Sequence, residues 1–296
     1  MRTVLLTGST GFLGQHFKKF YVNAGWRVLT LGRSAENDIF WDVKLRRTIS
    51  SSDFIYPIER IVHCAAINET LTEESTETTF DVNVTFTRTL SNLAIELDVK
   101  EFIYISTFHV YGVSSGTVGP DSVCRPINDY GLTHFLSEEI LRNTLPPRQI
   151  STLCLRPTNI YGIPVDMNNF DRWTLVHFDF IKKAMEDKCI RLLTAGNQER
   201  NFVDICNVVQ AEPQQQSFEV RDIYGNDTFT IKDFAQMVAD LIKDTHQIDV
   251  QIIKPDDAIQ FEKNNGLLKF LDTGSSYKPK GTLEEFIKQF SSIFCN

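Results

Sequence analysis

TGSTGFLG, residues 7–14, is the part of the sequence from which the rest of the molecule can be inferred. It follows a short apolar run, TVLLT at 3–7, which is typical of a strand buried on both faces, and it leads into an amphipathic, helix-like stretch. Gly8, Gly11 and Gly14 let the backbone turn sharply and come close to a ligand, because side chains here would obstruct both. The stretch therefore predicts a strand, a glycine turn and a helix whose N-terminus binds a pyrophosphate.

Strand-like and helix-like segments alternate after this turn. The further runs that predict strands are RVLTL (27–31), IFWD (39–42), RIVHCAA (60–66), EFIYIS (101–106) and STLCLRP (151–157). Helical spacing predicts helices at about 76–97 and 129–144, the second ending before the Pro-Pro pair at 146–147, which cannot continue it. Because strands that alternate with helices form a parallel sheet, we expect an α/β fold. It is a Rossmann-type doubly wound parallel sheet with a smaller C-terminal substrate lobe.

The pattern loosens after the sixth strand. Loops, an aromatic-rich helix at about 170–186 and short strands follow, and the last helix, at about 282–290, begins with a capping-box pattern, TLEE. We expect an NAD(P)-binding domain at 1–160, with 203–228 returning to it, and a smaller substrate-binding lobe at 161–296.

Composition excludes several classes of partner. Among 296 residues, Asp and Glu number 38 and Lys and Arg 30, and without a basic patch this acidity argues against a nucleic acid or an anionic membrane. The chain has no apolar run of membrane-spanning length, and its beginning lacks the pattern of a signal peptide. We therefore expect a cytoplasmic protein. Its cysteines lack metal-ligand spacing, lie mostly in apolar surroundings and are predicted to be buried thiols: Cys64, Cys124, Cys154, Cys189, Cys206 and Cys295. We expect no bound metal.

The end of the second strand bears on the choice of cofactor. A dinucleotide-binding fold usually has Asp or Glu about 20 residues after the glycine turn, where it binds the 2′-hydroxyl of the adenine ribose. This chain instead has Gly32 and Arg33. An arginine can hold a 2′-phosphate by a forked, charge-assisted contact, so we predict NADP(H) in preference to NAD(H). The alternative is that Arg33 is a solvated loop side chain.

Several further segments share one family resemblance. They are Asp42 in FWDVK, VHCAA (62–66), the helix with Asn83-Val84, VKEFIYISTFHVYG (99–112), LRPTNIYG (155–162), RNFVDICNVVQA (200–211) and LDTGSSYKPKGTLEEF (271–286). With the glycine turn, this ordered set resembles the extended short-chain dehydrogenase/reductases, in the NAD-dependent epimerase/dehydratase branch that acts on nucleotide sugars. The resemblance spans nearly the whole chain. It implies an NAD(P)-dependent nucleotide-sugar reductase or epimerase, in which a hydride moves at a sugar carbon.

The resemblance also implies binding residues. The cofactor set comprises Gly8, Thr10, Gly11, Phe12, Leu13, Gly14, Arg33, Asp42, Ala65, Ala66 and Asn83. The substrate set comprises His109, Asn159 and Arg200, with Arg200 facing the nucleotide diphosphate; structural roles are the alternative for each. Relatives often dimerise through a four-helix bundle, so a homodimer is expected through the helices at 76–97 and after Tyr130. The alternative is that the apolar residues of these helices only cover the sheet.

The family's catalytic residues correspond to Thr107, four residues before the tyrosine of VYG, and to Tyr130, which opens the Y-x-x-x-K motif. The lysine position holds His134. A lysine cation favours the tyrosinate of a residue whose ordinary pKa is about 10, whereas histidine is mostly neutral at pH 7 and supplies less charge. Histidine can still donate a hydrogen bond to a ribose hydroxyl.

The substitution at 134 separates two hypotheses. A reductase tolerates it, because Tyr130 then donates a proton and needs no lowered pKa. The alternative is a cofactor-binding homologue without turnover, acting as a sensor or an assembly subunit. Phe108 and His109 follow Thr107 where the family's 4,6-dehydratases have Asp-Glu, so that reaction is disfavoured.

Overall fold

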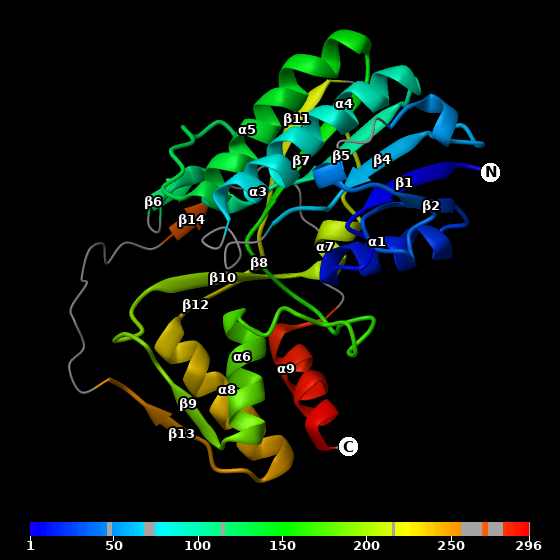
Figure 1. The fold of residues 1–296 in the computed structure, drawn as a ribbon. Helices are drawn as coiled ribbons and strands as arrows, with labels where there is room; N and C mark the ends of the chain where they lie inside the picture. The colour runs from blue at the N-terminus through cyan, green and yellow to red at the C-terminus, as the bar shows by residue number, and fades with distance from the viewer. Residues whose placement is uncertain are drawn as a thin grey trace. The chain divides into compact units, whose positions relative to one another are not determined.

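The computed structural model of the chain describes residues 1–45, 49–67, 75–113, 116–214, 217–255, 268–271 and 281–295. Residues 272–280, within the last segment of the family resemblance, lie outside these ranges. The chain forms two compact units (Figure 1). Unit 1 comprises Met1–Val113, Pro120–Pro157 and Val208–Ile223, and unit 2 comprises Ser114–Gly119, Thr158–Asn207 and Tyr224–Asn296.

Unit 1 is built on a parallel sheet of seven strands in the order β11-β7-β5-β4-β1-β2-β3. The strands are β1 (Thr3–Thr7), β2 (Arg27–Gly32), β3 (Ile39–Phe40), β4 (Arg60–His63), β5 (Glu101–Ile105), β7 (Ser151–Pro157) and β11 (Phe218–Ile223). The order reverses between β1 and β4, as in a doubly wound dinucleotide-binding fold. Every residue of β1, β4 and β7 is buried, which explains their continuous apolar or β-branched character. The predicted fold class is confirmed.

Helices cover this sheet. They are α1 (Phe12–Asn23), α3 (Thr76–Phe80), the π-helical turn η3 (Asp81–Thr85), α4 (Phe86–Glu96) and α5 (Asp129–Thr144). A short helix, α7 (Ile205–Val209), spans the boundary at which the chain returns from unit 2 to unit 1. Short 3₁₀ turns are η1 (Val43–Leu45), η2 (Ser51–Asp53), η4 (Phe108–Tyr111) and η5 (Pro146–Arg148). Helices α4 and α5 pack side by side (Figure 1). The rings of Trp41 and Phe86 stack at 4.2 Å in the core beneath α4.

Several local predictions were wrong at their boundaries. The helix predicted at about 76–97 is present from Thr76 to Glu96, but the sequence did not predict the π-helical turn η3 within it. Strand β3 ends at Phe40, two residues early, and α6 (Val176–Glu186) begins six residues after its predicted start. Among the six cysteines, which form no disulfide, only Cys154 is fully buried and Cys295 is exposed, so the prediction that most are buried was wrong.

The described residues of unit 2 form three small sheets. Strands β8 (Asn159–Tyr161), β10 (Glu199–Asp204) and β12 (Asp227–Thr230) form one, β9 (Cys189–Arg191) pairs with β13 (Gln251–Ile253), and β6 (Gly116–Val118) pairs with β14 (Leu268–Phe270). The other elements are α6, α8 (Ile231–His246), α9 (Leu283–Ser292) and η6 (Ile293–Cys295).

Aromatic packing holds the helices of unit 2 together. Phe178 of α6 contacts Phe286 and Phe290 of α9, with ring centres 5.6 and 5.0 Å away. Thr282 caps α9, and its side chain forms the predicted capping box with Glu285. No helix in the described ranges is long and apolar enough to cross a membrane.

Candidate functional site

The glycine turn packs against the loop that follows β4. Gly8 has a φ of +67°, and a Cβ placed on it would lie 2.7 Å from the backbone nitrogen of Ala65. A Cβ on Gly14 would overlap the carbonyl oxygen of Gly8. At Gly11 the nearest atom to an added Cβ would be 3.4 Å away, an ordinary contact. The fold itself thus requires Gly8 and Gly14, whereas the fold alone does not require glycine at position 11.

The helix N-terminus after this turn is suited to an anion. Gly11 is the N-cap of α1, no side chain caps the helix, and its first turn contains no acidic residue. The first backbone N–H groups of a helix lack intrahelical partners and lie at the positive end of its dipole. Thr10 is exposed at the turn, and Phe12 and Leu13, which begin α1, are partly buried. This end of α1 fits a pyrophosphate.

Asn37 lies between the glycine turn and the end of β2. Its Oδ1 accepts a hydrogen bond from Ser9 at 2.9 Å, and a Cβ on Gly32 would lie 3.1 Å from its Nδ2. Sequence reasoning missed this residue, because an asparagine in a polar loop carries no distinguishing signal. Arg33 is exposed and has no ion pair with the described residues. The nearby carboxylate of Asp38 accepts hydrogen bonds from both the N–H and the hydroxyl of Thr30, each at 2.8 Å.

A chain of hydrogen bonds through His63 fixes the loop after β4. The N–H of Ala65 donates to Thr7 Oγ1 at 3.2 Å, and the Thr7 hydroxyl lies 2.7 Å from His63 Nδ1. The Thr87 hydroxyl donates to the carbonyl oxygen of Asn83 at 2.6 Å, so its oxygen accepts from His63 Nε2, 3.0 Å away. Burial lowers the pKa of His63 to about 3, so the ring is neutral at pH 7 and both its nitrogens are satisfied.

Asn83 stabilises the same loop from the π-helical turn η3. Its side-chain oxygen accepts from the N–H of Ile67 at 2.7 Å, and its amide donates to the Ile67 carbonyl at 3.3 Å and to Thr133 Oγ1 at 3.0 Å. Both amide hydrogens are therefore used within the protein. A direct contact of Asn83 with a cofactor stays a prediction. The remaining predicted cofactor residues of this region, Asp42 and Ala66, are partly buried and exposed, respectively.

Thr107 and His109 follow β5 at the carboxyl edge of the sheet. Thr107 is buried and caps η4, its Oγ1 accepting from the N–H of His109 at 3.2 Å. The start of α5 lies against η4, because a Cβ on Gly131 would come within 2.6 Å of the His109 carbonyl oxygen. Asn128 begins α5 by accepting a hydrogen bond from the Gly131 N–H at 2.8 Å. Glycine at 131 thus allows the first turn of α5 to reach the residues after β5.

Tyr130 and His134 share a face of α5, as the sequence spacing predicts. Their rings meet edge to face with centres 4.7 Å apart, and the Tyr130 ring is 5.6 Å from that of His109. His134 is 2% exposed, and its Nδ1 lies 2.7 Å from the hydroxyl of Tyr104 in β5. Its Nε2 is buried and has no hydrogen-bond partner in the described structure. Burial, followed by the nearby His109, lowers the pKa of His134 to about 3, so the imidazole is neutral at pH 7.

A buried ionic network lies behind these residues. Glu138, one turn after His134, accepts hydrogen bonds from Ser106 at 2.5 Å and from Arg156 at 2.9 and 2.5 Å. Arg156 also donates to the Tyr111 hydroxyl at 2.9 Å, and that hydroxyl donates to Asp222 at 2.8 Å. The network connects α5, β7 and β11 to the residue that precedes Thr107.

The other two predicted substrate residues belong to unit 2. Asn159 donates to the carbonyl oxygen of Asn201 at 2.8 Å, which joins β8 to β10. Arg200 is partly buried, and its Nη1 donates to the Glu199 carbonyl at 2.9 Å. Burial lowers the pKa of Arg200, and no carboxylate of the described residues forms an ion pair with it. A partly buried guanidinium without a carboxylate partner is suited to an anionic ligand.

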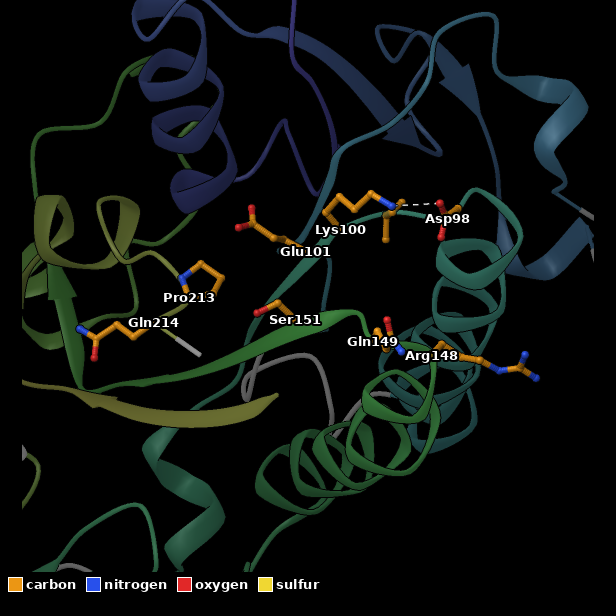
Figure 2. A pocket seen from close by; sticks show the side chains of 9 residues that line it. Asp98, Lys100, Glu101, Arg148, Gln149, Ser151, Pro213 and Gln214 are labelled. Atoms are coloured by element: carbon orange, nitrogen blue, oxygen red, sulfur yellow. Dashed lines mark hydrogen bonds and ion pairs between the residues drawn. The ribbon is translucent and has the colours of Figure 1, made fainter. Parts of the chain in front are cut away.

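A surface hollow of about 380 Å³ lies at the opposite edge of the sheet (Figure 2). Glu101 and Ser151, the first residues of β5 and β7, line it together with Arg148. Lys100 and Asp98, also in its lining, form an ion pair at 2.9 Å in which both side chains are exposed. The candidate residues follow the carboxyl ends of the strands, so this hollow is separate from them.

The strand order and the glycine turn are those of Rossmann-type dinucleotide-binding proteins. More narrowly, the model of the NAD dependent epimerase/dehydratase family matches residues 4–212, and the chain belongs to that family. The resemblance inferred from the sequence is thereby confirmed.

Known relatives include both epimerases and a reductase. The chain is 29% identical over 267 residues to a UDP-glucose 4-epimerase of Vibrio cholerae, with 85% of this chain and 79% of the relative covered. It is 27% identical over 263 residues to a dTDP-4-dehydro-6-deoxy-D-allose reductase of Streptomyces sp, with 80% of each covered. The solved structure of UDP-glucuronic acid 4-epimerase from Bacillus cereus, in complex with UDP-glucuronic acid and NAD, superposes with a TM-score of 0.80. That match covers 99% of both chains at 20% identity and supports the fold.

Proposed function

We propose that the chain is an NAD(P)-dependent reductase or epimerase of a nucleotide-activated sugar, with Tyr130 as the acid/base. The observation that carries the proposal is one shared edge of the sheet. Thr7, His63 and Tyr104 pair in register across β1, β4 and β5, so the glycine turn and the residues after β5 begin at the same edge. The substrate class follows the relatives, whose names include a UDP-sugar epimerase and a dTDP-sugar reductase.

In the proposed site the backbone at Gly8, Gly11 and the start of α1 binds the pyrophosphate, and His134 donates to a ribose hydroxyl. When bound, the nicotinamide ring exchanges a hydride with a sugar carbon. Tyr130 exchanges the accompanying proton with the sugar oxygen, and the Thr107 hydroxyl orients that oxygen. Asn159 lies beside the sugar or the cofactor, and Arg200 faces the nucleotide diphosphate of the substrate.

The proposal also includes the preferred cofactor and the oligomeric state. Arg33, exposed and without an ion pair in the described ranges, gives a preference for NADP(H) by contacting a 2′-phosphate. A homodimer forms through α4 and α5, because Leu132, Leu136 and Ile140 form a partly exposed apolar stripe along α5. Light scattering on the purified chain, and on Leu136→Glu, tests the dimer.

A second candidate function is favoured by one observation, the neutral imidazole of His134 where the family has a cation. A chain that lacks this cation can bind cofactor as a sensor or an assembly subunit without turning over a sugar. Both functions predict that a cofactor binds. They differ in how substitutions at Tyr130 and His134 change the turnover of a sugar substrate.

The experiment measures NAD(P)(H) oxidation and reduction with UDP-, GDP- and dTDP-sugars and their keto derivatives. Tyr130→Phe is expected to lower turnover by about 10²–10⁴-fold while dinucleotide binding persists, because only the proton-transfer group is lost. His134→Lys is expected to raise the oxidative rate more than the reductive rate, and His134→Gln, which keeps a neutral donor, is the matched control. Wild-type activity unchanged in Tyr130→Phe contradicts the proposal. Activity that only His134→Lys creates identifies the non-catalytic homologue.

A further inference from the structure

We infer that Tyr104 is a positioning residue for His134. Its hydroxyl donates to Nδ1, keeps the imidazole proton on Nε2, and makes His134 a neutral one-hydrogen donor to a ligand hydroxyl. The identity of that ligand, a ribose hydroxyl of a bound dinucleotide, rests on the proposed function; the tautomer does not.

The two side chains meet in the interior of unit 1. Tyr104 in β5 is 1% exposed and His134 in α5 is 2% exposed, and the hydroxyl and Nδ1 are 2.7 Å apart. The rings are tilted by 34° with centres 5.8 Å apart. Because water does not compete for this hydrogen bond, the protein alone sets its direction.

The direction follows from the acceptors around Tyr104. Burial raises the pKa of Tyr104 well above its ordinary value, so the hydroxyl keeps its proton. The Ser137 hydroxyl is its other neighbour, but the proton of Ser137 is used by the carbonyl oxygens of Asn83 and Thr133, at 2.7 and 2.8 Å. An imidazole nitrogen is a much stronger base than an alcohol oxygen, so Tyr104 donates to His134.

The proton of a neutral imidazole must then be on Nε2. His63 shows what a purely structural histidine looks like in the same core, because Thr7 and Thr87 satisfy both of its nitrogens. His134 differs, since its Nε2 is buried without an acceptor among the described residues. A buried donor left unsatisfied is costly, so this N–H requires a partner from outside the described residues, and we infer that a bound ligand supplies it. Its partner must be an acceptor such as a hydroxyl oxygen.

Nitrogen-15 NMR of histidine-labelled protein tests the inference without any ligand. In the wild type, His134 is expected to be a single neutral tautomer with the proton on Nε2. Tyr104→Phe is expected to convert it to a mixture of tautomers, because Nδ1 loses its donor. Tyr21→Phe removes another buried hydroxyl, one that accepts from Arg60, and should leave His134 unchanged. His177 of α6, whose ring contacts Phe178, Phe202 and Phe286, serves as the internal reference in every spectrum.

Titrations with NADH and with ADP provide the second readout. Tyr104→Phe is expected to weaken NADH binding about threefold to tenfold, the effect of one misaligned hydrogen bond, and to leave ADP binding unchanged. A wild-type His134 protonated on Nδ1, or the same tautomer in wild type and Tyr104→Phe, would overturn the inference. The wild-type spectrum is decisive even if the variant does not fold. If neither NADH nor NADPH binds the wild type, the proposed function fails, and the tautomer measurement still tests Tyr104.

Discussion

Replacing Glu138 with glutamine should destabilise the chain far more than the same change at the adjacent Glu139. Glu138 is fully buried, and its two oxygens accept from Arg156 Nε and Nη2 and from Ser106. Glutamine has nearly the same shape but only one acceptor oxygen, and its amide group would face the guanidinium. Arg156, 2% exposed, would remain charged and would lose the carboxylate that contacts it directly.

The burial of each ion pair determines how much unfolding free energy each variant should lose. Removing one partner of a buried ion pair costs about 3–5 kcal/mol, because the other charge stays buried. Glu139 pairs with Arg142 at 3.0 Å, but the two side chains are 39% and 47% exposed, so solvent screens the pair. Glu139→Gln should therefore cost less than about 0.5 kcal/mol. The two variants remove the same charge from neighbouring positions of one helix, so they differ chiefly in burial and partners.

Urea unfolding of wild type, Glu138→Gln and Glu139→Gln at pH 7, followed by circular dichroism, measures both free energies. The slope against urea concentration should stay the same, so that the difference is in stability and not in the surface exposed on unfolding. If the two variants lose stability equally within about 1 kcal/mol, the buried pair is not the stabilising feature described here.

Three further outcomes are expected. Gly14→Ala should lower the free energy of unfolding by about 1–3 kcal/mol, because its methyl group overlaps the Gly8 carbonyl. Gly11→Ala should change the free energy of unfolding by less than about 1 kcal/mol and yet abolish dinucleotide binding. Calorimetry that finds normal dinucleotide binding to Gly11→Ala would exclude the predicted pyrophosphate position. Arg33→Ala should remove a preference for NADPH over NADH of about tenfold or more, and equal affinities in the wild type would refute that preference. Burial raises the pKa of Asp222 to about 6, so the contribution of Asp222 to stability is present at low pH and is lost as pH rises through 6. The buried histidines have the opposite effect, because their contribution to stability is lost as pH falls below about 6.5. Asp222→Asn should therefore make the loss of stability between pH 7 and pH 5 steeper, and an unchanged slope in urea unfolding across that range would count against this.

The sheet of unit 1 could be predicted because its signals are local. Each strand buried on both faces is a short apolar or β-branched run, and the glycine turn is specified within residues 7–14. The four-residue spacing of Tyr130 and His134 places them on one face of a helix in any fold. The site roles of these residues stay predictions, to be tested as described above.

The features that the sequence did not reveal are contacts between residues far apart in the chain. Tyr104 and His134 are 30 residues apart, and no periodic pattern joins a hydroxyl in a strand to a ring in a later helix. Strands β6 and β14 pair Gly116 with Leu268, and neither short segment has a pattern that identifies its partner. The π-helical turn was missed for another reason, since one added residue leaves the apolar spacing close to that of an ordinary helix.

The place of β11 in the chain affects how the protein is made. β11 pairs with β7 along its whole length, from Phe218 opposite Thr152 to Ile223 opposite Pro157. One entire segment of unit 2, Thr158–Asn207, nevertheless separates the two strands in sequence. At about 5–20 residues per second, the ribosome needs several seconds after Pro157 to complete β11. During that time the nascent sheet has a bare parallel edge at β7, a template for pairing with other chains. Yield in a cell should therefore depend on translation speed across 158–217 and on chaperones that cover this edge until β11 emerges.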